Sequence, residues 1–328
     1  AAEALGKIGD RRAIDGLLRA IEDSKAGVRA VAAQALSKVS NTYVVGRLLE
    51  ILRHKNLNVR LLAAETLGDI GGAQATPGLI EALTDEKPYM RWAAVVALGK
   101  LVDRRAVESL LVMLNDPALD VRRAAAEALG KIGDQRAVEA LLEILSDKDE
   151  ALRGLAAEAL GKISDVRATE RLITGIKNDS PGVQWNCAKA LGKMNDERAV
   201  RALLEALPDT DPRVRRTIVD SLGLAGVPAA IGGLLTALKD KDGSVRRAAL
   251  AELRKQSIEV LAEGLEEALS HSDDFVRKRA AQGVGYYSSS RAVLEKLSGL
   301  AKHDPVEDVR KVADAARARY AFKLSYFS

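Results

Sequence analysis

Cysteine, histidine and aromatic residues are all scarce in this chain of 328 residues. It has one cysteine, three histidines and only 3% aromatic side chains. The single Cys187 excludes an internal disulfide and suits a reducing compartment, so we expect a cytoplasmic protein. No run of apolar residues is long enough to span a bilayer, and we expect no membrane partner.

An excess of one charge is also missing. The 50 basic and 46 acidic residues give a formal net charge of only +4, and the two signs are mixed along the whole chain. There is no basic arm of the kind that binds nucleic acid. Composition therefore gives only weak support to a nucleic-acid-binding protein.

What the chain does have is a Val-Arg pair, or a close variant of it, that returns at a fixed interval. The arginine position, occupied once by Gln184, falls at residues 29, 60, 91, 122, 153, 184, 215, 246 and 277, and Arg310 follows. A period in this range is typical of a stacked repeat protein, in which each unit packs only on its neighbours. The repeat predicts the architecture and leaves the function open.

The clearest unit, Val121 to Asp147, predicts a pair of helices. Its first half places small and apolar residues at i, i+3, i+4 and i+7. Gly133 suits the end of that helix, and Asp134 is well placed to cap the next one. No segment alternates polar and apolar residues as a half-buried strand does, so we expect an all-α fold.

The recurring pattern of Asp, then Val-Arg, then Ala-Ala-x-Ala-Leu-Gly-x-Ile-Gly-Asp resembles a HEAT repeat of the phycobilisome-lyase-like subtype. The resemblance covers almost the whole chain. It implies a right-handed α-solenoid of paired antiparallel helices, about ten repeats long, with the Val-Arg helices on the concave side. It implies a fold more firmly than an activity.

We predict one continuous solenoid over residues 1–319 and a separate ending over residues 320–328. Residues 1–10 match the second half of a helix, so we expect the chain to begin inside a repeat, as a piece of a longer protein would. The ending gathers aromatic residues in an aromatic-poor chain. It is either a cap on the last repeat or a self-docking tail, which makes the chain a monomer or a tail-mediated dimer.

A ladder of acidic residues stands six positions before the arginines, and we expect each Arg to pair with the Asp that precedes it. HEAT repeats similarly use an Asp and an Arg to tie adjacent layers together, and where Arg becomes Gln184 its Asp has become Asn178. Losing one partner of a buried pair costs roughly 3–5 kcal/mol, whereas losing both can be close to neutral. The paired change favours a structural role over partner binding for the ladder, whose members are Asp23, Arg29, Asp85, Arg91, Asp116, Arg122, Asp147, Arg153, Asp209, Arg215, Asp240 and Arg246.

We predict no catalytic residue, metal site or cofactor. His54 and His271 occupy the ladder's Asp position and His303 lies beside Asp304, but a metal needs converging ligands and these histidines belong to separated repeats. Deoxyhypusine hydroxylase, an enzyme built from similar repeats, binds di-iron through His-Glu pairs, and none of these histidines is followed by Glu. Cys187 stands where other repeats have Ala, which indicates a small buried side chain rather than a reactive thiol.

The places one, two, five and nine residues after each Arg share one face of the Val-Arg helix and vary freely. The ninth places form a mainly basic stripe, and the first places include both tryptophans. Trp and Arg most often dominate interface energies. The predicted partner-binding surface consists of Trp92, Arg123, Lys131, Lys162, Trp185, Lys189, Lys193, Arg216, Arg247, Lys278 and Arg279.

The leading hypothesis is therefore a non-catalytic scaffold or adaptor that binds an acidic or amphipathic protein partner along the concave face. Two alternatives stay open. The resemblance implies a bilin lyase or chaperone-like lyase subunit, because the repeat is named from proteins that attach bilins to phycobiliproteins. The basic stripe would also suit nucleic acid, as in HEAT-like DNA glycosylases, although several carboxylates interrupt it.

Overall fold

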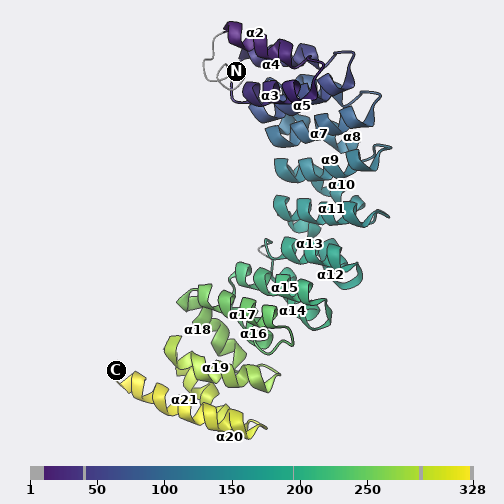
Figure 1. Cartoon of the computed structure of the whole chain (residues 1–328). Helices are drawn as coiled ribbons and strands as arrows, with labels where there is room; N and C mark the ends of the chain where they lie inside the picture. The colour runs from purple at the N-terminus through teal and green to yellow at the C-terminus, as the bar shows by residue number, and fades with distance from the viewer. Residues whose placement is uncertain (1–10, 40–41, 195, 288–290, 326–328) are drawn as a thin grey trace. The chain divides into compact units, whose positions relative to one another are not determined.

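The computed structural model describes residues 11–39, 42–194, 196–287 and 291–325, except for the side chains of residues 11, 209 and 322–325 (Figure 1). All regular structure within these ranges is helical, which confirms the predicted all-α fold. The predicted partial repeat at residues 1–10 lies outside them. The chain forms two compact units, residues 1–165 and 166–328, and each is described by itself.

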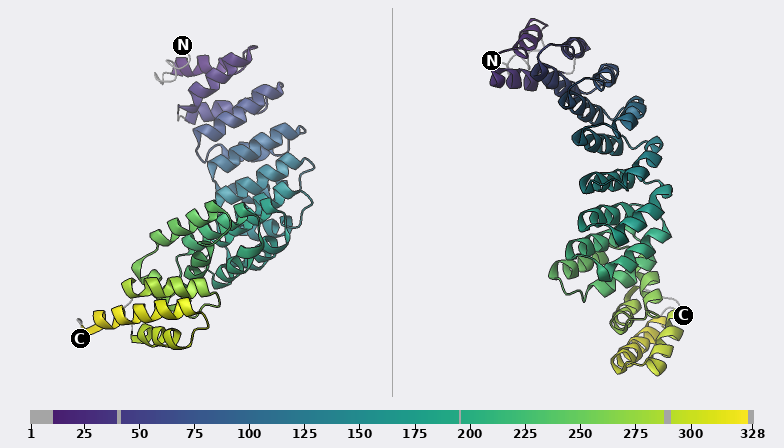
Figure 2. Two further views of the ribbon diagram at one scale, coloured as in Figure 1. Left: turned by 60° about the horizontal axis from the view of Figure 1, so that its bottom comes forward. Right: turned by 90° about the vertical axis from the view of Figure 1, so that its right-hand side faces the viewer.

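In unit 1 the Val-Arg helices alternate along the chain with a second series of helices. The Val-Arg helices are α3 (Ala26–Ser37), α5 (Leu57–Ile70), α7 (Pro88–Leu101), α9 (Leu119–Ile132) and α11 (Glu150–Ile163). The alternating elements are α2 (Arg11–Ala20), α4 (Thr42–Ile51), α6 (Thr76–Ala82), η1 (Arg104–Ala106), α8 (Val107–Met113), η2 (Gln135–Ala137) and α10 (Val138–Ile144). Each Val-Arg helix packs on the next one and on its own alternating partner, so the unit is a two-layered stack (Figures 1 and 2).

Unit 2 has the same two alternating series of helices, with consecutive Val-Arg helices packed closely from α13 to α17 and from α19 to α21. Its Val-Arg helices are α13 (Pro181–Leu191), α15 (Pro212–Ala225), α17 (Gly243–Lys255), α19 (Asp274–Tyr287) and α21 (Glu307–Ser325). The alternating elements are η3 (Val166–Ala168), α12 (Thr169–Asn178), α14 (Glu197–Ala206), η4 (Leu207–Asp209), α16 (Pro228–Ala237), α18 (Ile258–Ala268) and α20 (Arg291–His303). Helix α15 packs on both α13 and α17, which places their variable residues side by side.

The predicted helix end and cap at Gly133 and Asp134 are confirmed. Gly133 has the left-handed conformation, with φ 68°, and its N–H donates to the carbonyl of Leu129. The carboxylate of Asp134 accepts from the backbone N–H of Arg136 at 3.0 Å. The cap opens a short 3-10 turn before α10, a detail that the pattern did not predict. No helix in the described part of the chain is long and apolar enough to cross a membrane.

Glycine in the Leu-Gly motif lets consecutive Val-Arg helices approach closely. A Cβ on Gly130 of α9 would lie 2.7 Å from Cβ and 2.8 Å from Cα of Ala159 on α11. Gly99 meets Ala128 in the same way, with a shortest distance of 2.9 Å. The motif therefore sets the spacing of the helices that carry the variable face.

Gly130→Ala is expected to lower the free energy of unfolding by about 1–3 kcal/mol, because the added methyl overpacks a helix contact. Gly46→Ala is the matched control, since Gly46 lies inside α4 and a Cβ added there would meet no atom within 4 Å. Because alanine has a better helix propensity than glycine, Gly46→Ala should raise the free energy of unfolding by about 0.8–1 kcal/mol. Chemical denaturation of both variants measures the difference, and equal shifts would contradict the close-packing account.

Candidate functional site

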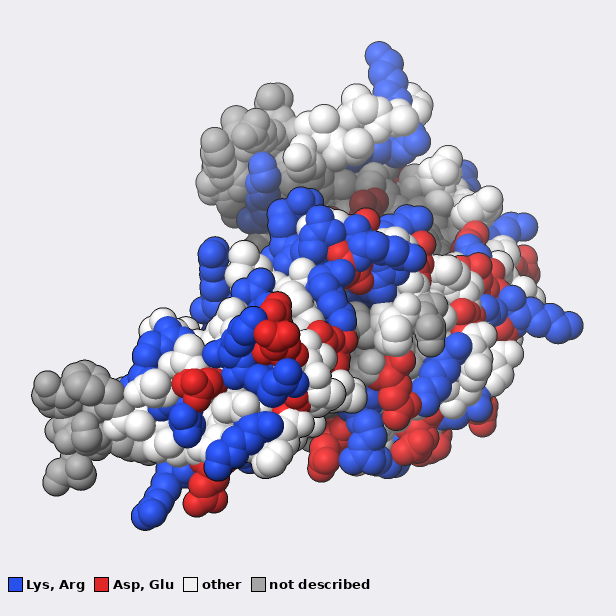
Figure 3. Space-filling view, turned by 90° about the horizontal axis from the view of Figure 1, so that it is seen from below, with Lys and Arg blue, Asp and Glu red and all other residues white. Residues whose placement is uncertain are grey.

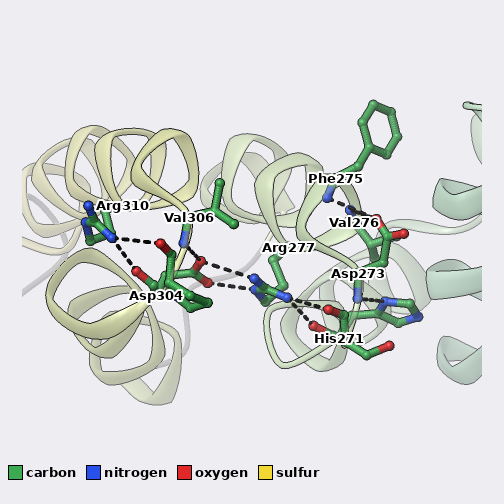
Figure 4. Close-up of polar contacts among 10 residues, drawn as sticks. His271, Asp273, Phe275, Val276, Arg277, Asp304, Val306 and Arg310 are labelled. Carbon is green, nitrogen blue, oxygen red and sulfur yellow. Dashed lines mark hydrogen bonds and ion pairs between the residues drawn. The ribbon is translucent and has the colours of Figure 1, made fainter.

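The ladder arginines donate hydrogen bonds within their own repeat, and four of them also pair with a carboxylate of the next repeat, namely Arg60, Arg91, Arg215 and Arg277. Nη1 donates to the backbone carbonyl six residues earlier, at 2.6–3.0 Å, in Arg29, Arg60, Arg91, Arg122, Arg153, Arg246, Arg277 and Arg310. In these four arginines the other edge of the guanidinium faces the next repeat. Nε and Nη2 of Arg91 hold Asp116 at 2.7 and 2.8 Å, and Arg277 holds Asp304 at 2.7 and 3.1 Å (Figure 4).

This geometry corrects the predicted pairing within a repeat. The Asp six residues before an Arg offers it a backbone carbonyl, and the carboxylate that the Arg holds comes from the following repeat, as in Arg215 with Asp240 at 2.7 Å. The joint change to Asn178 and Gln184 thus does not remove both halves of one ion pair. The side chain of Asp209 lies outside the described residues, and Arg215 donates instead to the carbonyl of Thr210 at 2.7 Å.

The ladder carboxylates also cap turns, and histidine can take their place. Asp116 accepts from the backbone N–H of Ala118 at 2.8 Å. Nδ1 of His54 and of His271 accepts the corresponding N–H at 3.0 Å, which confirms these histidines as polar substitutes in the turn (Figure 4). Burial lowers the pKa of His271, which favours the neutral ring that can accept a hydrogen bond.

Cys187 is fully buried, as its alanine-like position predicted. Burial raises the pKa of its thiol to about 12, so the thiolate is not formed at neutral pH. Among the described residues, no three or more His, Cys, Asp or Glu side chains are grouped so that they could hold a metal ion.

In unit 1 the basic residues of the predicted surface form ion pairs with nearby carboxylates. Lys131 pairs with Glu127 at 2.7 Å and Lys162 with Glu158 at 2.9 Å. Arg123 is held by two bonds from Nε and Nη2 to Asp149, at 3.0 and 2.7 Å. Cations in this unit are therefore largely occupied by its own carboxylates.

An apolar cavity of about 740 Å³ opens on the Val-Arg helices of unit 1. Trp92 and Arg123 both line it, so the structure brings two of the predicted surface residues together. Trp92 remains 43% exposed. The remaining lining residues are Pro88, Tyr89, Val96, Ala118, Asp120, Val121, Ala124, Glu127 and Leu155.

Sequence reasoning missed the apolar part of this cavity. Val96 and Leu155 stand at the fifth and second places after their arginines, where only charged residues and tryptophans were singled out. Tyr89 lies two residues before Arg91 and is 71% exposed. An aromatic residue in an otherwise aromatic-poor chain was the available signal.

In unit 2 several of the predicted cations form no ion pair. Among described residues, no salt bridge is formed by Lys189, Lys193, Arg216, Arg247 or Arg279. Lys278, in contrast, pairs with Asp308 at 2.9 Å. Arg279 lies over the ring of Phe275, at 5.2 Å from its centroid. Lys193 lines a separate cavity of about 700 Å³ near the ends of α13 and α15.

Trp185 directly follows Gln184, which occupies the arginine position of α13. It is 39% exposed, and Nζ of Lys189 lies 5.0 Å from its ring centroid, within cation–π distance. Arg216 and Arg247 follow at the same place on α15 and α17, and both are exposed. These three residues and Lys189 are called the cationic row below. Over the face of the molecule that Figure 3 shows, basic side chains are plentiful, with acidic ones interspersed among them.

The family model for HEAT repeats matches residues 1–56, 45–118, 107–183, 169–254 and 233–317. The chain belongs to the HEAT-repeat family. This result confirms the family and the α-solenoid fold predicted from the Val-Arg and Ala-Leu-Gly patterns. Among curated proteins, no sequence matches the chain.

Solved HEAT-like structures share the fold at low sequence identity. An engineered protein is 20% identical, with 94% of this chain and 98% of that chain covered and a TM-score of 0.50. YibA of Escherichia coli is 21% identical over 78% of this chain and 96% of its own, with a TM-score of 0.55. The complex of CpcE and CpcF of phycocyanin lyase from Nostoc is 21% identical over 74% and 94%, with a TM-score of 0.44. At identities this low the first two matches show the fold alone, and the third, with a TM-score below 0.5, adds nothing to that.

Proposed function

We propose that this HEAT-repeat chain is a non-catalytic scaffold, working in the cytoplasm, whose unit 2 binds an acidic segment of a protein partner. The observation that carries the proposal is the cationic row. Lys189, Arg216 and Arg247 are exposed and form no ion pair among the described residues, whereas the cations of the predicted surface in unit 1 are paired, namely Arg123, Lys131 and Lys162. Open faces of stacked repeats are the surfaces that such proteins use for binding.

The spacing of the row suits carboxylates on a peptide. Helices α13, α15 and α17 pack in succession, and packed helices lie roughly 8–10 Å apart. A peptide in the polyproline II conformation has three residues per turn and rises about 3.1 Å per residue, so every third side chain lies on the same face and meets the next helix. Arg216 and Arg247 can each bind a carboxylate through two hydrogen bonds, and Trp185 adds an aromatic anchor beside them.

Carboxylates near the row favour a peptide over nucleic acid. Asp220 lies on α15 four residues after Arg216. Burial raises the pKa of Asp220, the charge of Arg216 opposes that rise, and the nearby carboxylate of Glu252 adds to it. Duplex DNA carries one negative charge per roughly 1.7 Å of helix axis and cannot avoid these groups. A peptide can place its acidic side chains at Arg216 and Arg247 alone.

The test uses a fluorescein-labelled peptide with Glu at every third position and one Leu, with binding followed by anisotropy. Replacing Trp185, Arg216 and Arg247 with Ala should weaken binding at least tenfold. The charge-matched control, Arg201→Ala with Arg213→Ala, removes two exposed arginines of the same unit that form pairs with Glu197 and Asp211. It should bind as the parent does.

Circular dichroism verifies that the variants stay helical. Equal affinity of the triple variant would overturn the proposal. So would tighter binding of duplex DNA than of the peptide, with affinity falling steeply as salt rises.

A further inference from the structure

We infer that the cavity beside Trp92 binds an amphipathic helix whose apolar side chains are flanked by lysines or arginines. The inference rests on the proposed scaffold function in one respect, which is that the ligand is a protein. Its site lies in unit 1 and shares no residue with the cationic row. The chain would therefore carry two docking sites of opposite charge preference.

The cavity has the composition of a side-chain socket. Tyr89, Trp92 and Val96 come from α7, and Leu155 comes from α11, with Ala124 of α9 between these helices. Tyr89 is 71% and Trp92 43% exposed, so two aromatic rings face solvent in a chain with few aromatics. Large partly exposed aromatics in a concavity are typical anchors for a partner's apolar side chains.

The charges around the cavity favour a cationic partner. Asp120 has a side chain that is 80% exposed, and its nearest cation, Arg123, lies 3.8 Å away. Arg123 is already committed to Asp149 by two shorter bonds. Glu127 forms an ion pair with Lys131. The cavity lining therefore carries two carboxylates, Asp120 and Glu127, and one cation, Arg123, and the carboxylate of Asp120 is the most accessible of them.

A helix fits this surface better than an extended peptide does. The lining is mostly Ala, Val, Leu and aromatic side chains, of which only Tyr89 and Trp92 carry a hydrogen-bonding group, so it offers few partners to an exposed peptide backbone. A helical ligand satisfies its backbone internally and presents side chains at i, i+3, i+4 and i+7. Helices α7 to α11 span roughly 16–20 Å between axes, and a helix rises 1.5 Å per residue, so about 11–13 residues cross them.

The experiment uses two labelled 14-residue peptides with identical leucines at helical spacing, one flanked by lysines and one by glutamates. We expect saturable binding of the lysine peptide and at least tenfold weaker binding of the glutamate peptide. Tyr89→Ser with Trp92→Ser should weaken the lysine peptide at least tenfold, and Asp120→Asn should weaken it several-fold. Val112→Ser is the control, since Val112 is 65% exposed on α8 and does not line the cavity.

A second readout reports occupation of the cavity directly. In a Trp185→Phe background Trp92 is the only tryptophan, and the lysine peptide should shift its fluorescence emission to shorter wavelength. An unshifted emission, absent binding of the lysine peptide, equal binding of both peptides or full binding to the Tyr89/Trp92 variant would each overturn the inference.

The two sites fail independently. Arg216→Ala with Arg247→Ala should leave the lysine peptide's affinity unchanged, and the Tyr89/Trp92 variant should leave the acidic peptide's affinity unchanged. If the parent chain binds the acidic peptide but not the lysine peptide, the inference is refuted. If it binds the lysine peptide but not the acidic peptide, the proposed function is refuted.

Discussion

Arg277→Gln is expected to lower the free energy of unfolding by about 3–5 kcal/mol, because it leaves the buried carboxylate of Asp304 without its partner. The side chain of Asp304 is only 1% exposed and that of Arg277 11%. Adding Asp304→Asn should recover most of this loss, since no buried charge is then left unpaired. Chemical denaturation of the two single variants and the double variant gives the coupling free energy.

The pH dependence of the same variants provides a second check. Hydrogen bonding to Arg277 lowers the pKa of Asp304 in the folded chain. The stability that Asp304 contributes is therefore complete above its unfolded pKa, near 3.9, and is lost as pH falls through the lower folded pKa. The gap in stability between parent and Arg277→Gln should narrow toward low pH. A constant gap would contradict the ion-pair explanation.

The exposed pair of Arg47 and Glu50 supplies the control. Its side chains are 47% and 66% exposed, and Arg47→Gln should change stability by no more than about 0.5 kcal/mol. If Arg47→Gln lowered the free energy of unfolding as much as Arg277→Gln does, burial would not determine the cost of breaking an ion pair.

Tyr320→Ala is expected to lower stability by about 3–5 kcal/mol, the usual cost of removing a buried aromatic ring. Tyr320 is 1% exposed although it stands near the end of the last helix. Its ring packs at Gly285 of α19, where a Cβ would lie 3.7 Å from the ring carbon Cδ2. The ring thus packs between α21 and α19, in the contact between the last two Val-Arg helices.

Tyr286→Ala is the matched control, since Tyr286 is 70% exposed on α19 and should change stability little. Thermal melting and light scattering together separate the two predicted roles of residues 320–328. A lower melting temperature with unchanged mass supports the cap, whereas a halved mass with unchanged melting temperature supports the tail. Helix α21 runs through Tyr320 to Ser325, and residues 326–328 lie outside the described residues.

The local features of the fold were predictable because they depend on neighbours in sequence. Gly133 and Asp134 end one helix and cap the next through bonds that span two to four residues. The alanine-like position of Cys187 likewise predicted its burial. The ladder was predicted only in part. Its residues were recognised, but periodicity alone could not show that guanidinium groups such as that of Arg277 reach forward to a carboxylate of the next repeat.

The sequence by itself determined that this protein is an all-helical stack of HEAT repeats with a variable face on each Val-Arg helix. The reason is that a fixed period in small and apolar residues leaves one way to bury them. Only the tertiary structure decided which cations on that face are held in ion pairs. Arg123 and Asp149 are 26 residues apart, and their pairing depends on the register of adjacent helices, whereas Arg216 and Arg247 form no such pair among the described residues.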